Sequence, residues 1–171
     1  MLNGEGLRVV LWVAHCIHNC PGCHNLQTHD ENSGVPFDEA ALNELTEELK
    51  KDYTAGITFS GGDPLSPLNR GEILSLAAHF RQTFPEKSIW LYTGFEWEEI
   101  SDLPGIANFD VIVDGRFVIA RKDNTLPYRG SSNQRVIDVR KTLDKGSVVT
   151  VKGTSGKTEP TMNQPATCCG A

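Results

Sequence analysis

The sequence predicts an α/β domain with a mainly parallel sheet and flanking helices, the sheet being open or partly curled into a barrel. Apolar, β-branched segments alternate along the chain with amphipathic segments of helical period. Strands that alternate with helices are joined by right-handed crossovers, which make neighbouring strands parallel. The length of 171 residues suits one compact domain that buries a core without disulfide or metal staples.

The first predicted elements are a strand, a helix and a second strand. Residues 8–14 (RVVLWVA) form an apolar run without alternation, which suits a strand covered on both faces. A helix is predicted over residues 38–51, with Asp38 as its candidate N-cap. Its leucines fall at helical spacing and form one stripe: Leu42, Leu45 and Leu49. Residues 56–60 (GITFS) are the second predicted strand.

A second helix and a third strand follow. The helix is predicted over residues 71–84, with Asn69 placed to cap it and Pro85 ending it. Its core side is expected to carry four apolar residues: Ile73, Leu76, Ala77 and Phe80. Residues 88–93 (SIWLYT) are the third predicted strand.

The last predicted elements are a short acidic helix at residues 96–100 and a strand at residues 109–113 (FDVIV). The domain is expected to span residues 1–152. Residues 153–171 are rich in Gly, Thr, Pro and Ser and contain almost no large apolar residue, so they are predicted to be a disordered tail.

The chemically distinctive segments each follow a predicted strand. They are the cysteine segment after residues 8–14 and, after the next three strands, residues 60–64 (SGGDP), 92–94 (YTG) and 114–116 (DGR). Ligands of parallel α/β sheets bind at the carboxyl ends of the strands. We therefore expect these four segments to share one rim.

Composition excludes several classes of function. The 16 basic and 22 acidic residues give a net charge of −6, which disfavours nucleic-acid binding. The longest apolar run, residues 9–14, is too short to span a bilayer and no secretion signal is evident, so a cytoplasmic protein without membrane association is expected. Five cysteines in such a chain indicate metal or redox chemistry rather than a disulfide framework.

Cys16, Cys20 and Cys23 are the candidate metal ligands. Pro21 and Gly22 break regular structure between them, leaving a loop whose thiolates can converge on a compact object. An iron–sulfur cube held by three cysteines keeps one iron open, whereas four thiolates would close it. The spacing therefore predicts a [4Fe-4S] cluster with a free coordination position.

Three other interpretations of this loop are considered. The cysteines are buried packing residues in the first. In the second they form a zinc site, with His15, His18 or His24 as the fourth ligand. In the third, Cys20 and Cys23 are a dithiol redox pair resembling thioredoxin. His15 and His18 are not counted as cluster ligands, since a histidine in such a loop more often donates a hydrogen bond to sulfur or backbone.

Six segments together resemble the activating enzymes of anaerobic ribonucleotide reductases, a branch of the radical S-adenosylmethionine superfamily. They are residues 3–6 (NGEG), 8–14, 16–25 (CIHNCPGCHN), 60–65 (SGGDPL), 113–117 (VDGRF) and 129–135 (RGSSNQR). The three-cysteine motif alone is typical of the superfamily. The RGSSNQ run together with GGDP narrows the resemblance to this branch.

The resemblance implies a partial (β/α) barrel of the radical S-adenosylmethionine type. The open iron of a [4Fe-4S] cluster would chelate S-adenosylmethionine, and reductive cleavage would give methionine and a 5′-deoxyadenosyl radical. That radical would produce a glycyl radical on the large subunit of an anaerobic ribonucleoside-triphosphate reductase. A flavodoxin- or ferredoxin-like protein would donate the electron.

Contacts to the cofactor are expected from two segments. Gly61 and Gly62 lack a β-carbon, so their backbone can approach the methionine part, and Asp63 is placed to bind its ammonium group. Taken alone, this segment would be interpreted as an ordinary turn. Three residues beside the cluster are expected to contact the adenine through their backbone: Gly22, Cys23 and His24.

Other roles stay open from the sequence. The polar residues Arg129, Ser131, Ser132 and Asn133 could meet the cofactor carboxylate or the partner protein, or form a polar surface turn. Cys168 and Cys169 are not counted as ligands because a fourth thiolate would block the cofactor. The alternative functions are an activase of another glycyl-radical enzyme, such as pyruvate formate-lyase, and a non-catalytic zinc-binding interaction module.

Overall fold

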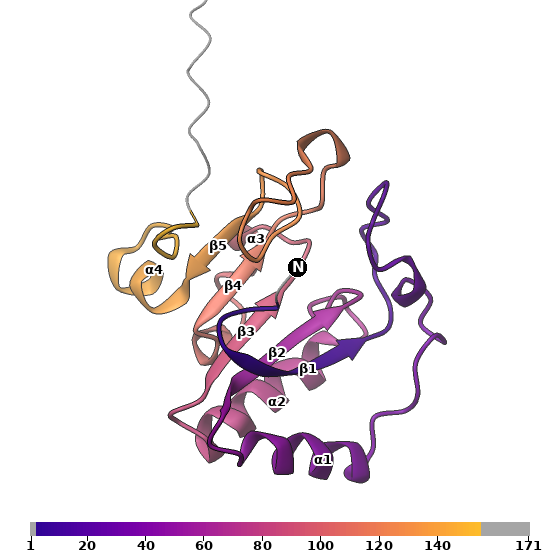
Figure 1. Ribbon diagram of the computed structural model, residues 1–171, viewed down its shortest axis with the longest axis vertical. Coiled ribbons are helices and arrows are strands. Elements are labelled where there is room, and N and C mark those ends of the chain that lie inside the picture. The colour runs from indigo at the N-terminus through magenta and orange to yellow at the C-terminus, as the bar shows by residue number, and fades with distance from the viewer. Residues whose placement is uncertain (1–2, 155–171) are drawn as a thin grey trace, which may run out of the picture.

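The computed structural model describes residues 3–154, which form one five-stranded sheet in the order β1-β2-β3-β4-β5 (Figure 1). The strands are β1 (Leu7–Val13), β2 (Thr54–Gly61), β3 (Ser88–Tyr92), β4 (Val111–Asp114) and β5 (Arg135–Asp138). The first four are parallel and β5 is antiparallel to β4. The predicted α/β class with a mainly parallel sheet is confirmed. Its curvature into a partial barrel stays a prediction.

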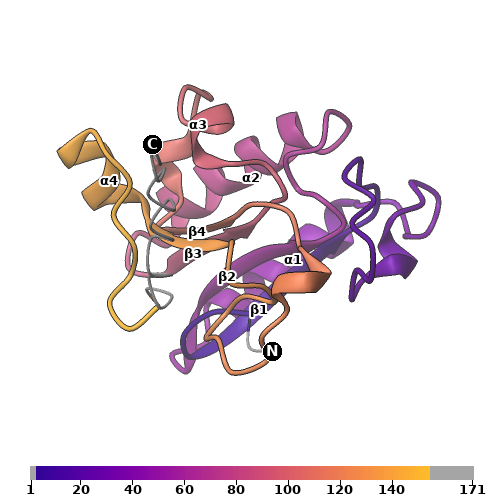
Figure 2. The same ribbon diagram turned by 90° about the horizontal axis from the view of Figure 1, so that it is seen from above.

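The helices that join the parallel strands lie on one face of the sheet. They are α1 (Glu39–Leu49), α2 (Arg70–Thr83) and α3 (Trp97–Ile100), and α4 (Val139–Lys145) follows β5. Short 3-10 turns are η1 (Leu26–Thr28), η2 (Ile106–Asn108) and η3 (Ile119–Arg121). Each right-handed crossover leads to the adjacent strand, so all of them fall on the same side. Figure 2 shows α2 and α3 on that side and the segment between β4 and β5 on the other.

The main core lies between the sheet and these helices. The four residues predicted for the core side of α2 are all buried, and they pack against strand residues such as Phe59, Leu91 and Ile112. Of the predicted leucine stripe on α1, only Leu49 is fully buried, whereas Leu42 and Leu45 are partly buried at its margin. Burial of these stripes is the principal force holding the helices to the sheet.

The two predicted helix caps have different outcomes. Asp38 caps α1 as predicted, because its side chain accepts a hydrogen bond from Ala41 N at 2.9 Å. Asn69 precedes α2 but makes no side-chain cap. Its amide instead donates to Ala14 O at 2.8 Å and to Asp63 O at 3.1 Å. The prediction of a capping bond was wrong because carbonyls from other segments compete for the same amide.

Strand β1 is an edge strand and none of its residues is fully buried, contrary to the expectation that it is covered on both faces. It pairs only with β2 in the described sheet, and Trp12 is 46% exposed. The strands follow one another in sequence order across the sheet, which places the first of them at the margin. An unalternating apolar run therefore does not by itself show that a strand is central.

The second face of the sheet carries its own smaller cluster. Trp90 and Tyr128 meet edge to face with ring centroids 5.1 Å apart. The guanidinium of Arg8 lies 5.4 Å from the Trp90 ring centroid and donates to Thr58 Oγ1 at 2.8 Å. Burial lowers the pKa of Arg8 to about 10. The segment between β4 and β5, which contains Tyr128, therefore packs onto this face.

The sequence did not predict β5 and α4. Asp138 ends β5 and caps α4, its Oδ1 accepting from Lys141 N at 3.0 Å. Gly146 closes α4 in the left-handed conformation, with a φ of 69°. An aspartate and a glycine at these positions are ordinary helix boundaries and were available as signals. The fourth strand was predicted to begin at Phe109, which instead follows η2 and packs in the core.

The predicted tail lies almost wholly outside the described residues, as do Cys168 and Cys169. Thr154, the last described residue, is buried, and its N–H donates to Val151 O at 3.1 Å. The division of the chain at residue 153 stays a prediction. Within residues 3–154, none of the helices has the length and apolar character that crossing a membrane requires.

Candidate iron–sulfur site

The segments that follow the four parallel strands meet at one rim, as predicted. Gly62 N donates to Val13 O at 2.7 Å and Asp63 N to His15 O at 2.8 Å, which joins the second segment to the cysteine segment. Gly115 N donates to Phe95 O at 2.9 Å, which joins the fourth segment to the third. In Figure 1 the indigo cysteine segment and the orange segment after β4 extend from the same end of the sheet.

The cysteine segment is a curled loop rather than a helix. His15, Asn19 and Gly22 have positive φ values of 71°, 46° and 72°. Non-glycine residues adopt such values only where surrounding contacts hold them there. Two backbone bonds close the loop, from Cys16 N to His29 O at 3.3 Å and from Cys23 N to Cys20 O at 3.1 Å.

The three thiols are free and partly buried. Burial raises the pKa of the Cys16 and Cys20 thiols. Cys23 Sγ accepts a hydrogen bond from Asn25 N at 3.4 Å. Iron binds the thiolate form, so metal binding to this loop would release the thiol protons. Metal binding would thereby offset the preference for the protonated thiol that burial causes.

The described residues contain no ready-made site for a single metal ion. Among residues 3–154, no group of three or more His, Cys, Asp or Glu side chains is close enough together to hold one metal ion. The zinc interpretation requires such a group, because four ligands surround one ion. A cube takes each cysteine on a different iron, so its ligands need not converge on one point.

A pocket of about 280 Å³ lies beside the cysteine loop. Its walls are the cysteine loop and the segment after β4, through His18, Cys20, Pro21, Arg116, Phe117, Val118 and Ile119. A backbone hydrogen bond from Phe117 to the Cys20 thiol connects the two walls, and both this bond and the charge of Arg116 favour the thiolate. The pocket is therefore adjacent to the proposed ligand Cys20.

His18 anchors the cysteine loop to the rest of the rim. Its side chain is only 2% exposed, and its Nε2 lies 2.5 Å from Asp63 Oδ2. The imidazole also meets the Phe95 ring edge to face, with centroids 4.7 Å apart. A β-carbon on Gly94 would overlap the imidazole, so the rim is shaped around this side chain. The sequence pointed to His18 only as a hydrogen-bonding residue of the loop.

Asp63 is the centre of a buried hydrogen-bond network. The residue is 1% exposed, and its carboxylate accepts from Leu65 N at 2.8 Å, Gly94 N at 2.9 Å and Thr93 Oγ1 at 2.9 Å, besides His18. These bonds hold three rim segments together. The expected contact of Asp63 with an ammonium group stays a prediction, since its carboxylate is already fully engaged inside the protein.

At the glycines of the predicted cofactor site, the packing of the protein itself leaves no room for a β-carbon. A β-carbon on Gly62 would overlap the carbonyl oxygen of His15, and one on Gly61 would lie 2.6 Å from Val13 O. One on Gly22 would lie 2.7 Å from Ile119 Cδ1. Close packing of the rim segments thus requires these glycines. The expected contacts of Gly61, Gly62, Gly22, Cys23 and His24 with S-adenosylmethionine stay predictions.

Gly62→Ala is expected to destabilise the protein even when no cofactor is present. The new methyl group would push against the backbone of His15, at a cost of about 1–3 kcal/mol of unfolding free energy. Urea denaturation of the metal-free chain measures this. Gly71→Ala is the matched control because a β-carbon there meets nothing within 4 Å. Equal stability of the two variants would mean that the rim tolerates a side chain at Gly62.

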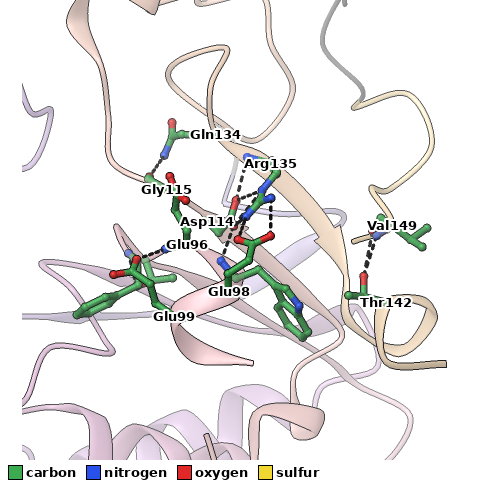
Figure 3. Close-up of polar contacts among 12 residues, drawn as sticks. Glu96, Glu98, Glu99, Asp114, Gly115, Gln134, Arg135, Thr142 and Val149 are labelled. Atoms are coloured by element: carbon green, nitrogen blue, oxygen red, sulfur yellow. Dashed lines mark hydrogen bonds and ion pairs between the residues drawn. The ribbon is translucent and has the colours of Figure 1, made fainter. Parts of the chain in front are cut away.

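A second network of hydrogen bonds and ion pairs joins the two ends of the segment between β4 and β5 (Figure 3). Asp114, 1% exposed, accepts from Trp97 N at 2.8 Å and forms an ion pair with Arg135 at 2.5 Å. Arg135 also pairs with Glu98 at 2.7 Å, and this hydrogen bond lowers the pKa of Glu98. Gln134 Nε2 donates to Gly115 O at 3.0 Å. Part of the RGSSNQR run therefore serves to hold the rim.

Comparison with known proteins identifies relatives over most of the chain. A family model described as "4Fe-4S single cluster domain" matches residues 2–137. A protein of Enterobacteria phage T4 is 43% identical over 139 residues, which cover 79% of this chain and 86% of the relative. One of Escherichia coli K12 is 41% identical over 144 residues, covering 82% and 94%. One of Haemophilus influenzae is 38% identical over 141 residues, covering 78% and 89%.

All three relatives carry the same name, anaerobic ribonucleoside-triphosphate reductase-activating protein. The family model begins before β1, includes the cysteine loop and ends within β5. No solved structure matches the chain.

Proposed function

We propose a function from the premise that this chain belongs to the family of anaerobic ribonucleoside-triphosphate reductase-activating proteins. In this proposal the chain cleaves S-adenosylmethionine reductively at a [4Fe-4S] cluster. The activity would leave a glycyl radical on the large subunit of an anaerobic reductase. A flavodoxin- or ferredoxin-like protein in the cytoplasm would supply the electron. The observation that carries the proposal is the curled loop with three free thiols at the carboxyl ends of the parallel strands.

The residues of the chain have distinct tasks in this proposal. Cys16, Cys20 and Cys23 hold the cluster, which when bound supplies the electron for cleavage of S-adenosylmethionine. His18 and Asp63 keep the loop in one orientation on the rim, through a contact that water does not reach. Partial burial of the thiols shields the cluster from solvent and oxidants.

The partner would dock on the open rim. Radical transfer requires the target glycine to reach the cofactor, with the reacting atoms about 3–3.5 Å apart. Apolar side chains beside the pocket are exposed, Ile17 by 45% and Ile119 by 58%. Exposed apolar residues around a polar site are typical of a surface that a partner covers. This favours a protein substrate over a small molecule enclosed by the chain alone.

Anaerobic reconstitution and electron paramagnetic resonance test the proposal. The reduced cluster signal is expected to change when S-adenosylmethionine is added. With an anaerobic ribonucleoside-triphosphate reductase present, cleavage of the cofactor is expected to accelerate and a glycyl-radical doublet to appear on the large subunit only. A cluster signal indifferent to the cofactor would contradict the open iron.

The same reconstituted protein distinguishes the two alternative functions. A zinc-binding interaction module would be colourless, whereas the iron–sulfur protein is expected to be brown. An activase of pyruvate formate-lyase would give the glycyl radical on that enzyme instead. The name shared by the relatives and the RGSSNQR run favour the ribonucleotide reductase.

A further inference from the structure

Three buried side-chain atoms have no hydrogen-bond partner among residues 3–154. They are His18 Nδ1, Arg129 Nε and Asn133 Oδ1. Folded proteins leave few such atoms, because each has lost its water without gaining a bond. All three belong to the cysteine loop or to residues 129–135. The unsatisfied groups are therefore gathered at the rim and not scattered through the core.

Of the residues that carry these atoms, His18 lines the pocket, and Asn133 contacts the backbone of a lining residue. His18 and Arg116 line the pocket together with Cys20. Asn133 Nδ2 donates to Arg116 O at 2.8 Å, which fixes the side chain beside the same wall. The pocket next to Cys20 is thus bordered by polar groups that still lack a partner.

Arg129 reaches this wall through its neighbour Gly130. A β-carbon on Gly130 would lie 3.2 Å from the Phe117 ring, and Phe117 lines the pocket. The preceding residue, Tyr128, packs on Trp90 of the second sheet face. Arg129 is therefore held between the sheet face and the pocket wall.

Other polar side chains of residues 129–135 already have partners. Gln134 Oε1 accepts from two backbone N–H groups of its own segment, at 3.0 and 3.2 Å, and its Nε2 donates to Gly115 O at 3.0 Å (Figure 3). Arg135 forms its ion pair with Asp114 (Figure 3). These residues build the segment and leave no donor for a ligand.

Arg129 differs from Arg135 in the partners of its buried guanidinium. The residue is 3% exposed, and its Nε atom has no hydrogen-bond partner among residues 3–154. Burial lowers its pKa, an effect that the negative charge of Asp123 opposes. Arginine is almost never buried unless it is paired. Arg129 therefore keeps a buried donor, Nε, that no described residue satisfies and that a ligand carboxylate could accept.

We propose that Arg129 binds the carboxylate of the methionine part of S-adenosylmethionine. The inference rests on the proposed function, which brings this cofactor to the cysteine loop. A guanidinium offers parallel N–H donors in a planar fork that matches a carboxylate. Arg129 would act as a specificity-determining residue that recognises the amino-acid part of the cofactor, while the cysteines hold the cluster.

The first test asks whether Arg129 has a merely structural role. In the reconstituted full chain without S-adenosylmethionine, Arg129→Met is expected to keep the iron content of the parent and at least its denaturation midpoint. The reason is that the buried Nε of Arg129 has no hydrogen-bond partner among the described residues that the change would remove. Arg121→Met, at an exposed arginine of η3, is the matched control. A lower midpoint or iron content in Arg129→Met than in this control would assign a structural role and overturn the inference.

The second test measures binding of S-adenosylmethionine and of its decarboxylated analogue by anaerobic equilibrium dialysis. Arg129→Met is expected to weaken binding of S-adenosylmethionine about 10–100-fold, the worth of a charge-assisted bond, and to leave binding of the analogue at the parent value. Arg129→Lys is expected to restore part of the loss. Arg121→Met is expected to bind both ligands as the parent does.

Several outcomes would overturn the inference. Equal weakening for both ligands, or unchanged affinity for S-adenosylmethionine, would show that Arg129 does not recognise the carboxylate. Unchanged cofactor affinity with lost binding to the reductase would assign the anion to the partner protein. A parent chain that binds neither ligand would remove the proposed function as well, so the two failures are distinguishable.

Discussion

Replacement of Cys16, Cys20 or Cys23 by alanine is expected to abolish the cluster and all activation of a reductase. Each cysteine would hold a different iron of the cube, so a single loss removes one of only three protein ligands. Among residues 3–154, no group of three or more His, Cys, Asp or Glu side chains gathers to take its place. Iron and sulfide content after anaerobic reconstitution measures the effect, which should fall from about four irons per chain to background.

The double variant Cys168→Ala/Cys169→Ala is the control for these three. It removes two thiols from the part of the chain outside the described residues and is expected to leave iron content near that of the parent. Loss of the cluster from this variant would contradict the assignment of three ligands. Retention of a full cluster by any of the Cys16, Cys20 or Cys23 variants would contradict it equally.

Asp63→Ala is expected to destabilise the protein by about 3–5 kcal/mol, because it leaves buried donors without their acceptor. Those donors come from the cysteine loop, the turn after β2 and the segment after β3: His18 Nε2, Leu65 N, Thr93 Oγ1 and Gly94 N. The cysteine loop would lose its anchor, so cluster content is expected to fall together with stability. Denaturation of the metal-free chain and iron content of the reconstituted chain measure the two effects.

Two further variants are compared with Asp63→Ala in the same experiment. Asp52→Ala removes an exposed carboxylate and is expected to change stability by less than about 0.5 kcal/mol. Asp63→Asn keeps the shape and one acceptor oxygen, so its loss of stability is expected to be smaller than that of Asp63→Ala. Stability of Asp63→Ala equal to that of Asp52→Ala would show that the network contributes nothing to the fold.

Much of the fold could be predicted because it depends on local patterns. The apolar stripe of α2, the cap of α1 and the positions of the four parallel strands follow from residues close together in sequence. Strand β5 was missed because the polar run before it suggested a loop and only two residues, Val136 and Ile137, carry its apolar signal. It is stabilised by pairing with β4, a contact that no local pattern encodes.

The sequence predicted which residues belong to the candidate site better than it predicted what those residues contact. The cysteines, the Gly-Gly-Asp turn and the shared rim follow from spacing and from the direction of parallel strands. The sequence did not predict that Asp63 is buried and holds the rim segments together, and its contact with a ligand stays a prediction. The reason is that burial and partners are set by segments far apart in the chain, such as His18, 45 residues away.

By itself, the sequence determined the α/β class, the three thiols in one loop and the rim on which they lie, since covalent spacing and hydrophobic period are properties of the chain alone. Only the tertiary structure decided that β1 is an edge strand, that Arg135 forms ion pairs and that the Nε of Arg129 is buried without a described partner. Both arginines occur in one short polar run, and sequence distance does not distinguish them. The free energy of a buried charge depends on which side chains surround it. Folding alone brings Asp114 to Arg135 and leaves the Nε of Arg129 buried without a described partner.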